Sequence, residues 1–234
     1  MTDYKKTFHT PESKALPIVL LLDISYSMTQ PPTKIDSLNS AISEMLDDLK
    51  QASGECGFVL SVITFGGQAN CLYDPPYKNV KDVQWTELQV NGDTPLGTAL
   101  KMAKAMIDDK DTTLTSWYRP VVILVSDGQP TDSSVWEKAM DDFITEGRSS
   151  KTQRLAMAIG HDADENVLKR FIKGTSQPLF YAHNARDIRT FFKMVSTTAT
   201  GRSKQKDPNE LTNAPPLDPS NSSNDPLDDF LALG

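Results

Sequence analysis

The segment IVLLLDISYSM, residues 18–28, decides the fold class, because an uninterrupted apolar run is followed at once by short polar side chains. Apolar runs of this length are typical of strands that are buried on both faces of a parallel sheet. Similar runs follow at residues 58–65, 121–125 and 155–159, and a further strand is expected at 178–182. The chain therefore carries several strands of the buried, parallel type.

Segments with apolar residues at helical spacing lie between these strands. They fall within residues 38–49, 96–107, 136–143, 168–172 and 188–195. Alternation of buried strands with amphipathic helices predicts an α/β fold, a three-layer, doubly wound arrangement with helices on both faces of a mostly parallel sheet. Ligands bind at the carboxyl ends of the strands in such folds, so the residues that follow each strand are the candidates for a site.

The composition is that of an acidic globular protein. The chain has 234 residues, with 24 Lys and Arg against 31 Asp and Glu, and its net charge is −7. This balance argues against binding to nucleic acid or to an anionic membrane surface, because both need clustered basic residues. No stretch approaches the ~18 apolar residues of a membrane span, and the first residues are too polar for a secretory signal. We therefore expect a cytoplasmic protein without a membrane or nucleic-acid partner.

The composition shifts near residue 201, where a stretch rich in Pro, Ser, Asn and charged residues begins. Such a stretch has too few apolar side chains to offset the entropy of ordering, so it is expected to be disordered. The predicted organisation is an N-terminal extension at 1–16, a domain at 17–200, a disordered linker at 201–224 and a short interaction motif at 225–234. Several hydroxyl side chains of this tail are candidate phosphorylation sites: Ser203, Thr212, Ser220, Ser222 and Ser223.

The last ten residues, DPLDDFLALG, differ from the rest of the tail. Asp225 and Pro226 suit the first positions of a helix, and Leu227, Phe230 and Leu231 would then share one face. One interpretation is a docking peptide that folds into a groove of a partner protein. The other is a frayed terminus, because a helix this short is unstable alone in water.

Short oxygen-bearing side chains follow two of the predicted strands. Asp23, Ser25 and Ser27 come at positions i, i+2 and i+4 after the first strand, Thr94 precedes a helix, and Asp127 follows the strand at 121–125. Carboxylates and hydroxyls are hard ligands, which suit Mg²⁺ or Mn²⁺ better than zinc. Only two carboxylates leave such a cation short of negative charge, so the site could accept a third from another molecule. The nearby Asp93 and Asp132 are expected to be turn or cap residues.

At these residues the sequence resembles the von Willebrand factor A domain, whose metal-ion-dependent adhesion site uses a D-x-S-x-S loop, a distant Thr and a distant Asp. The resemblance covers roughly residues 17–196. Within this family the sequence is most similar to the bacterial tellurium-resistance-associated (TerY-like) branch. The motifs that carry this similarity are LLLDISYSM, VITFG, DTPLGTAL, RPVVILVSDGQPTD and FFKMVS.

The resemblance implies a sheet of six strands with one antiparallel edge strand, which residues 70–73 would supply. It implies that Ser25, Ser27 and Thr94 give hydroxyl ligands, while Asp23 and Asp127 act partly through bound water. The expected function is a metal-dependent protein-interaction module, not an enzyme, which binds an acidic residue of its partner. The TerY-like branch further implies an adaptor or regulator in a bacterial stress, defence or phosphosignalling system, with a Ser/Thr kinase and a PP2C-type phosphatase as partners.

The alternative is a Mg²⁺-dependent hydrolase or phosphatase of the haloacid-dehalogenase type, which also places an Asp after its first strand. Such enzymes need a second Asp two residues later as general acid, and here that position is Ser25, whose hydroxyl is a poor proton donor at neutral pH. The sequence also lacks the glycine-rich loops that bind nucleotide phosphates.

Overall fold

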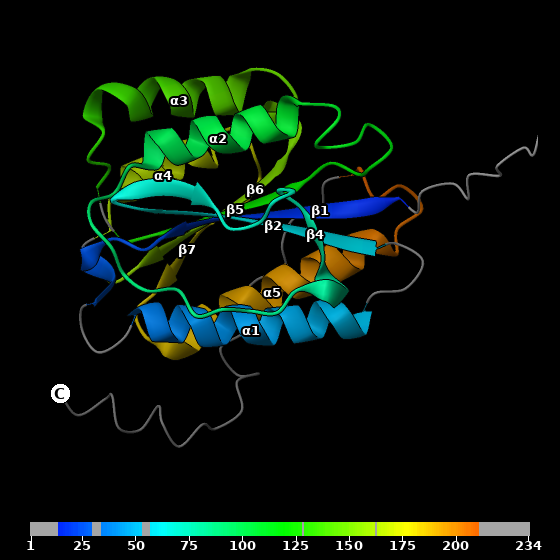
Figure 1. The fold of residues 1–234 in the computed structure, drawn as a ribbon, viewed down its shortest axis with the longest axis horizontal. Helices are drawn as coiled ribbons and strands as arrows, with labels where there is room; N and C mark the ends of the chain where they lie inside the picture. The colour runs from blue at the N-terminus through cyan, green and yellow to red at the C-terminus, as the bar shows by residue number, and fades with distance from the viewer. Residues whose placement is uncertain (1–13, 30–33, 53–56, 128, 162, 211–234) are drawn as a thin grey trace, which may run out of the picture.

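A computed structural model describes residues 14–29, 34–52, 57–127, 129–161 and 163–210. Its strands form one sheet in the order β3–β2–β1–β5–β6–β7, and β4 adds to β2 (Figure 1). The strands are β1 (Ala15–Asp23), β2 (Gly57–Gly66), β3 (Gln68–Cys71), β4 (Lys78–Asn79), β5 (Val121–Ser126), β6 (Gln153–Ile159) and β7 (Leu179–Ala182).

The sheet is mostly parallel, as predicted. β1 pairs in parallel with β2 and β5, and β6 pairs in parallel with β5 and β7. β3 is the expected antiparallel edge strand, although it begins two residues before the predicted run at 70–73. The two-residue β4 also runs antiparallel to β2, further along the same edge. The fold class predicted from the sequence is therefore confirmed.

Helices cover both faces of the sheet (Figure 1). α1 and α5 pack on one face, while α2, α3 and α4 pack on the other. Successive β1 side chains alternate between the two layers, because Leu20 and Leu22 face α1 and α5 while Val19 and Leu21 face the opposite helices. The α-helices are α1 (Lys34–Ala52), α2 (Leu96–Asp108), α3 (Ser133–Thr145), α4 (Glu165–Phe171) and α5 (Ala185–Ser203).

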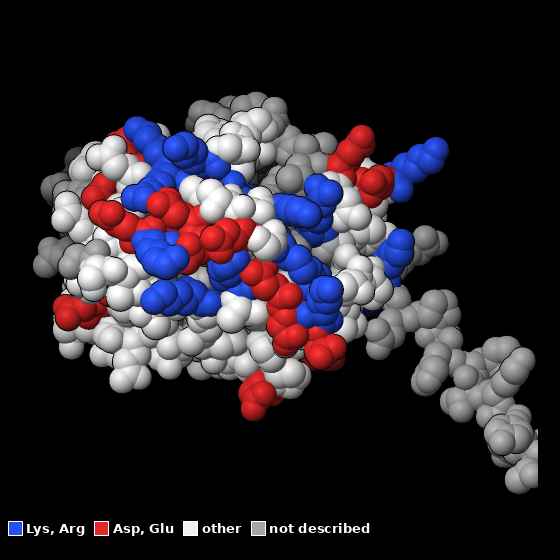
Figure 2. Space-filling view, turned by 90° about the horizontal axis from the view of Figure 1, so that it is seen from above, with Lys and Arg blue, Asp and Glu red and all other residues white. Residues whose placement is uncertain are grey.

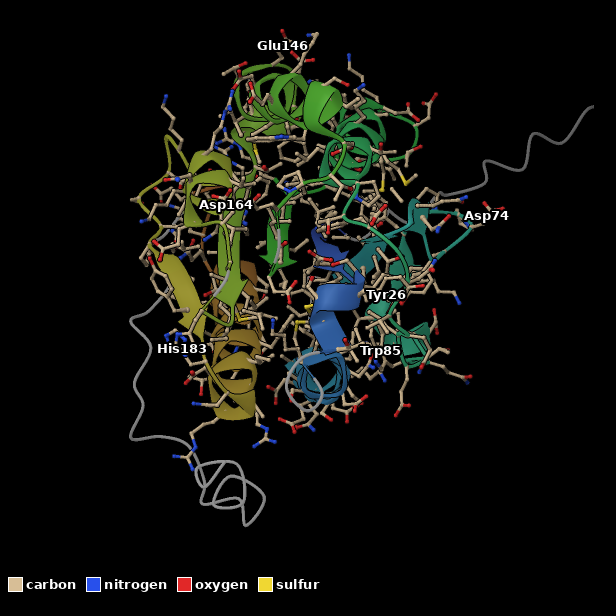
Figure 3. The ribbon with its side chains drawn as sticks, turned by 90° about the vertical axis from the view of Figure 1, so that its left-hand side faces the viewer. Tyr26, Asp74, Trp85, Glu146, Asp164 and His183 are labelled. Atoms are coloured by element: carbon tan, nitrogen blue, oxygen red, sulfur yellow. The ribbon has the colours of Figure 1, made fainter. Side chains whose placement is uncertain are left out.

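The order of the strands creates a switch point at the carboxyl end of β1. From β1 the chain moves outward to β2, and it later returns to β5 on the other side of β1. The loops that follow β1 and β5 therefore lie next to each other at this edge of the sheet, which is where α/β folds of this type bind ligands. Figure 3 views the molecule from this side.

The sequence predicts a disordered linker from residue 201, but in the structure α5 continues to Ser203 and the chain stays on the domain beyond it. Arg202 is fully buried, and its guanidinium donates hydrogen bonds to the carbonyl oxygens of Pro208 and Arg119 and to Oε1 of Gln153. The backbone N–H of Arg119 donates to Oδ1 of Asn209 over 2.8 Å. Residues 201–210 are therefore part of the domain, since one buried Arg secures a stretch whose composition is otherwise typical of a linker.

Several sequence predictions fall outside the described residues. These are most of the N-terminal extension, the linker from residue 211 onward and the motif at 225–234 with Leu227, Phe230 and Leu231. Ser203, placed in the tail by the sequence, lies instead in the last turn of α5, where its hydroxyl donates to the carbonyl of Thr200.

The outer face formed by α2, α3 and α4 mixes both signs of charge (Figure 2). Lys104–Asp108, Lys138–Asp142 and Arg170–Asp141 form ion pairs there. A face with interspersed charges offers no basic patch for a polyanion. Within the part of the chain that the structure describes, no helix is both long enough and apolar enough to cross a lipid bilayer.

Candidate metal site

The loop after β1 draws three predicted ligands together. Asp23 is the last residue of β1, and its Oδ1 accepts a hydrogen bond from the backbone N–H of Ser25 over 2.9 Å. The chain then turns through a short 3₁₀ helix, Tyr26–Thr29, which brings Oγ of Ser27 within 2.9 Å of Oγ of Ser25. The alternate positions of the D-x-S-x-S pattern thus face one another across a tight turn.

Asp127 joins this group from the carboxyl end of β5. Its Oδ1 accepts a hydrogen bond of 2.6 Å from Oγ of Ser27. Its Oδ2 accepts a hydrogen bond from Nζ of Lys34, the first residue of α1, at 2.5 Å. Next to Asp127, Ser126 donates from Oγ to Oδ2 of Asp23 over 2.6 Å. Each carboxylate is therefore linked by side chains to the loop that carries the other.

Thr94 is held beside these loops by its backbone. The N–H of Tyr26 donates to the carbonyl of Gly92, and the N–H of Asn91 donates to the carbonyl of Ile24. On the other side, the N–H of Thr131 donates to the carbonyl of Thr94, whose own N–H donates to Oγ1 of Thr131. Thr94 is 5% exposed. All five predicted ligands therefore lie at one edge of the sheet, four joined by side-chain contacts and Thr94 by its loop.

Glycines permit this close approach of loops. Gly92 has a φ of +56°, and a Cβ atom there would collide with the backbone of Gly67. In the TPLGTAL motif, a Cβ at Gly97 would lie 2.5 Å from Cα of Trp136, so Gly97 lets α2 pack against α3.

Asp132 is a cap, as the sequence predicted, but it caps the neighbouring helix. Its carboxylate accepts hydrogen bonds from the backbone N–H groups of Gly97 and Thr98 in the first turn of α2. These N–H groups have no partner within the helix, and the carboxylate is favoured by the helix dipole. Asp132 is thereby committed to structure and is not among the candidate ligands.

Burial makes the site favourable for a cation. Asp23 is fully buried, and desolvation raises its pKa even though hydrogen bonds from Ser126 and Ser25 oppose the rise; the nearby charge of Asp127 adds to it. A buried carboxylate is stabilised by an adjacent positive charge. Ser25 and Asp127 are each 2% exposed, whereas Ser27 is exposed, so the group is sheltered but reachable from solvent.

The donor set fits a hard divalent cation. It consists of two carboxylates and three hydroxyls, all oxygen ligands of the kind that Mg²⁺ and Mn²⁺ prefer. The described residues hold no group of three or more His, Cys, Asp or Glu side chains that could bind a metal. The hydroxyl-rich group at the switch point is therefore the candidate metal site.

The sequence did not indicate three residues that lie at this end of the sheet, namely Lys34, His161 and His183. Lys34 could have been noticed, because a Lys at the start of a helix opposes the helix dipole and needs another reason to be there. His161 and His183, which lie far apart in the sequence, follow β6 and β7 and stack with ring centroids 4.5 Å apart. No spacing in the sequence links them, because the pair arises only from the parallel alignment of the two strands.

Comparison with known proteins supports the family resemblance. Residues 18–129 match the model of the von Willebrand factor type A domain. A search of curated protein sequences finds no match.

Several solved structures share the fold, among them these three. A von Willebrand factor type A protein from Catenulispora acidiphila has a TM-score of 0.64 and 20% identity, over 80% of this chain and 43% of its own. Proximal thread matrix protein 1 from the mussel byssus, with a zinc-occupied MIDAS motif, has a TM-score of 0.59 and 16% identity, over 80% and 46%. The pilus adhesin SpaC from Lactobacillus rhamnosus GG, in an open conformation, has a TM-score of 0.62 and 14% identity, over 81% and 30%.

This chain spans less than half the length of each of those proteins. At such identities the likeness concerns the fold and not the activity. The chain thus has the fold of a von Willebrand factor type A domain, and its residues 18–129 match the sequence model of that domain.

Proposed function

We propose that the chain is a metal-dependent protein-interaction module. Mg²⁺, or Mn²⁺, is held by Asp23, Ser25, Ser27, Thr94 and Asp127, and a Glu or Asp of a partner protein completes the coordination. The observation that carries this proposal is the gathering of two carboxylates and three hydroxyls at the switch point of the sheet.

The charges at the site favour an anionic partner. Asp23 and Asp127 contribute −2 and Lys34 contributes +1, so the protein side carries −1 (−2 + 1). A divalent cation brings the total to +1. An incoming carboxylate would then neutralise the site, which supports an acidic side chain as the partner's contribution.

The choice of metal rests on ligand chemistry. The mussel byssus protein with the same fold holds zinc in its motif, which supports a cation at this position of the fold. Zinc usually takes nitrogen or sulfur ligands in proteins, whereas this site offers only oxygen. We therefore propose Mg²⁺ or Mn²⁺ here.

Exposed aromatic side chains lie at the same end of the sheet as the site and would contact the partner. Tyr26 lies within the D-x-S-x-S loop and is 63% exposed. His183 lies further along the same edge (Figure 3), where it stacks on His161, and both rings are exposed. Aromatic side chains of this kind supply much of the binding energy at protein interfaces. The metal would recognise one carboxylate, and these rings would select its sequence context.

No observation favours the hydrolase alternative. The position that would need a second Asp is Ser25, and its hydroxyl is engaged with Ser27. We propose a binding module without catalytic activity, acting in the cytoplasm as an adaptor or regulator in a TerY-like stress or phosphosignalling system. A Ser/Thr kinase, a PP2C-type phosphatase and docking through Leu227, Phe230 and Leu231 remain predictions from the sequence.

The first test is metal binding by the purified full chain. Isothermal titration with Mg²⁺ compares the wild type, Thr94→Val, and Thr145→Val as a matched control on the exposed end of α3. Valine keeps the shape of threonine but removes the ligand oxygen. We expect at least a tenfold weaker affinity for Thr94→Val, with an unchanged melting temperature in EDTA. Equal affinity of all three proteins would refute the site.

The second test concerns the partner. The tagged wild type and Thr94→Val are used to purify proteins from the native host, in Mg²⁺ or in EDTA. Partners that depend on both Mg²⁺ and Thr94 support the proposal. Partners retained by the variant and in EDTA would show that another face binds them.

A further inference from the structure

A hollow lies at the amino ends of the parallel strands, where β6 and β7 begin, and so at the end of the sheet opposite the candidate metal site. It has a volume of about 250 Å³ and is lined by residues that precede β5, β6 and β7 and by the first two residues of β6. Three lining residues are basic, namely Arg119, Lys151 and Arg154, and none of the described residues that line it is Asp or Glu. The other lining residues carry hydroxyl or amide groups, apart from Gly174, which has no side chain. We call this hollow the basic pocket.

Arg154 forms the buried wall of the basic pocket. It is 3% exposed, and its guanidinium donates to the carbonyl oxygens of Phe171, Ser150 and Lys173 over 2.8 to 3.1 Å. These bonds use three of its five N–H groups. Among the described residues no carboxylate pairs with Arg154, and burial lowers its pKa. A buried cation held only by neutral carbonyls favours an anion beside it.

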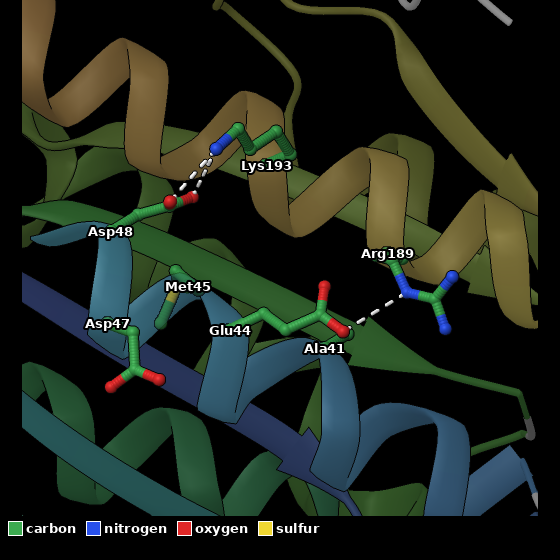
Figure 4. A pocket seen from close by; sticks show the side chains of 7 residues that line it. All are labelled: Ala41, Glu44, Met45, Asp47, Asp48, Arg189 and Lys193. Carbon is green, nitrogen blue, oxygen red and sulfur yellow. Dashed lines mark hydrogen bonds and ion pairs between the residues drawn. The ribbon is translucent and has the colours of Figure 1, made fainter. Parts of the chain in front are cut away.

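The pocket between α1 and α5 differs from the basic pocket in the pairing of its basic residues (Figure 4). It has a similar volume, about 240 Å³, but each of its two basic residues is paired with an acidic residue of the same pocket. Arg189 pairs with Glu44, and Lys193 pairs with Asp48. The basic pocket has no such internal partners among the described residues, so its charge is available to another group.

The chain itself brings acidic residues to this end of the sheet. Asn209 accepts a hydrogen bond from the backbone of Arg119, so the described chain ends beside the pocket wall, at Glu210. Residues 211–234 contain four Asp and no Lys or Arg; the acids are Asp218, Asp225, Asp228 and Asp229. Asp218 comes eight residues after Glu210, a reach of about 26 Å at ~3.3 Å per residue.

We propose that the acidic segment 218–229 of the same chain docks on the basic pocket through its aspartate carboxylates. Charge complementarity carries this assignment, together with the point at which the segment leaves the domain. A short tether gives the segment an effective concentration on the order of millimolar, so even a weak site is occupied. The contact is electrostatic and partly exposed, so salt weakens it. It lies at the end of the sheet opposite the metal site and is independent of it.

The test uses a fluorescein-labelled peptide of residues 211–234 and follows its anisotropy at low salt. The first acceptor is the full chain carrying D218N, D225N, D228N and D229N, whose own tail cannot compete. The second acceptor adds R119A and K151A, which remove two exposed bases of the pocket. The matched control instead adds K81A and K101A, two exposed bases elsewhere on the domain. The fourth protein is the wild-type full chain.

We expect the peptide to bind the first acceptor and the control with equal affinity, and at least tenfold more weakly to the pocket variant. The wild type should bind at least fivefold more weakly than the first acceptor, because its own tail fills the pocket. Equal binding to the pocket variant and the control would overturn the site. Equal binding to the wild type and the first acceptor would overturn the assignment of the tail, as would sedimentation of the wild type as a dimer joined through this contact.

Discussion

Nζ of Lys34 lies 2.5 Å from Oδ2 of Asp127, while Oδ1 of the same carboxylate accepts a hydrogen bond from Ser27. Both oxygens of this predicted ligand are thus engaged by side chains of the loop and helix that follow β1. The carboxylate is fully buried and the lysine side chain is 12% exposed, so water screens this pair little. Lys34 and Ser27 therefore hold the two carboxylate oxygens of Asp127 in place at the candidate metal site.

Replacing Lys34 should strengthen metal binding. Lys34→Met keeps the aliphatic stem but removes a positive charge that repels the cation, so we expect the affinity for Mg²⁺ to rise about three- to tenfold, or roughly 1 kcal/mol. Isothermal titration measures this, with Lys101→Met as the control on an exposed part of α2. A weaker affinity in Lys34→Met would mean that the lysine chiefly orients Asp127.

Replacing Asp23 should raise the stability of the metal-free protein and weaken metal binding. Burial raises the pKa of Asp23, so between its ordinary and its raised pKa the folded protein binds more protons than the unfolded protein. Its ionisation therefore lowers the free energy of unfolding as the pH rises through that range. In EDTA, Asp23→Asn should melt above the wild type at pH 7, by about 2–4 °C for each kcal/mol gained.

The stabilising effect of Asp23→Asn should shrink as the pH falls toward 4, since the wild-type carboxyl then becomes neutral as well. The same variant should lose the rise in melting temperature that Mg²⁺ gives the wild type. Thermal melts across this pH range measure both effects. A variant that is less stable than the wild type in EDTA at pH 7 would contradict the expectation.

Asp108 should stabilise the protein above pH 4. Its carboxylate is partly desolvated, which raises the pKa, but hydrogen bonds from Lys104 and from the backbone of Ser149 and Arg148 outweigh this and lower it. A lowered pKa gives stability that is present above the ordinary value and is lost as the pH falls below it.

Asp108→Asn should therefore lower the free energy of unfolding at pH 7 by about 1–3 kcal/mol. The difference from the wild type should narrow at pH 3. Urea unfolding at the two pH values measures this, with Asp111→Asn as an exposed control in the turn that follows α2. If the free energies of unfolding of the wild type and Asp108→Asn differed equally at both pH values, the charge of Asp108 would not be the source of the stability.

Arg202 should hold the last described residues on the domain. Arg202→Met removes the donors to Pro208, Arg119 and Gln153 and leaves their oxygens without these bonds. We expect a loss of about 2–4 kcal/mol of stability and faster amide exchange in residues 204–210. Lys204→Met, which changes an exposed neighbour, should do neither. Unchanged exchange in Arg202→Met would refute this role.

The sequence predicted the elements of the fold because each carries a local signal. Buried runs such as that of β1 have no polar residue to interrupt them, and α1 repeats its apolar residues at helical spacing. The order of strands and helices then restricted the topology to a doubly wound sheet. The five candidate ligands were also readable, since each lies directly after a strand or before a helix.

By itself, then, the sequence determined the parallel α/β fold and the identity of Asp23, Ser25, Ser27, Thr94 and Asp127 as the candidate ligands, because patterning and short motifs are local properties. Only the tertiary structure decided which groups from distant segments meet them. The contact of Lys34 with Asp127, the stacking of His161 on His183 and the burial of Arg202 depend on how strands align and helices pack. No local pattern encodes such contacts, because they join residues far apart in the chain.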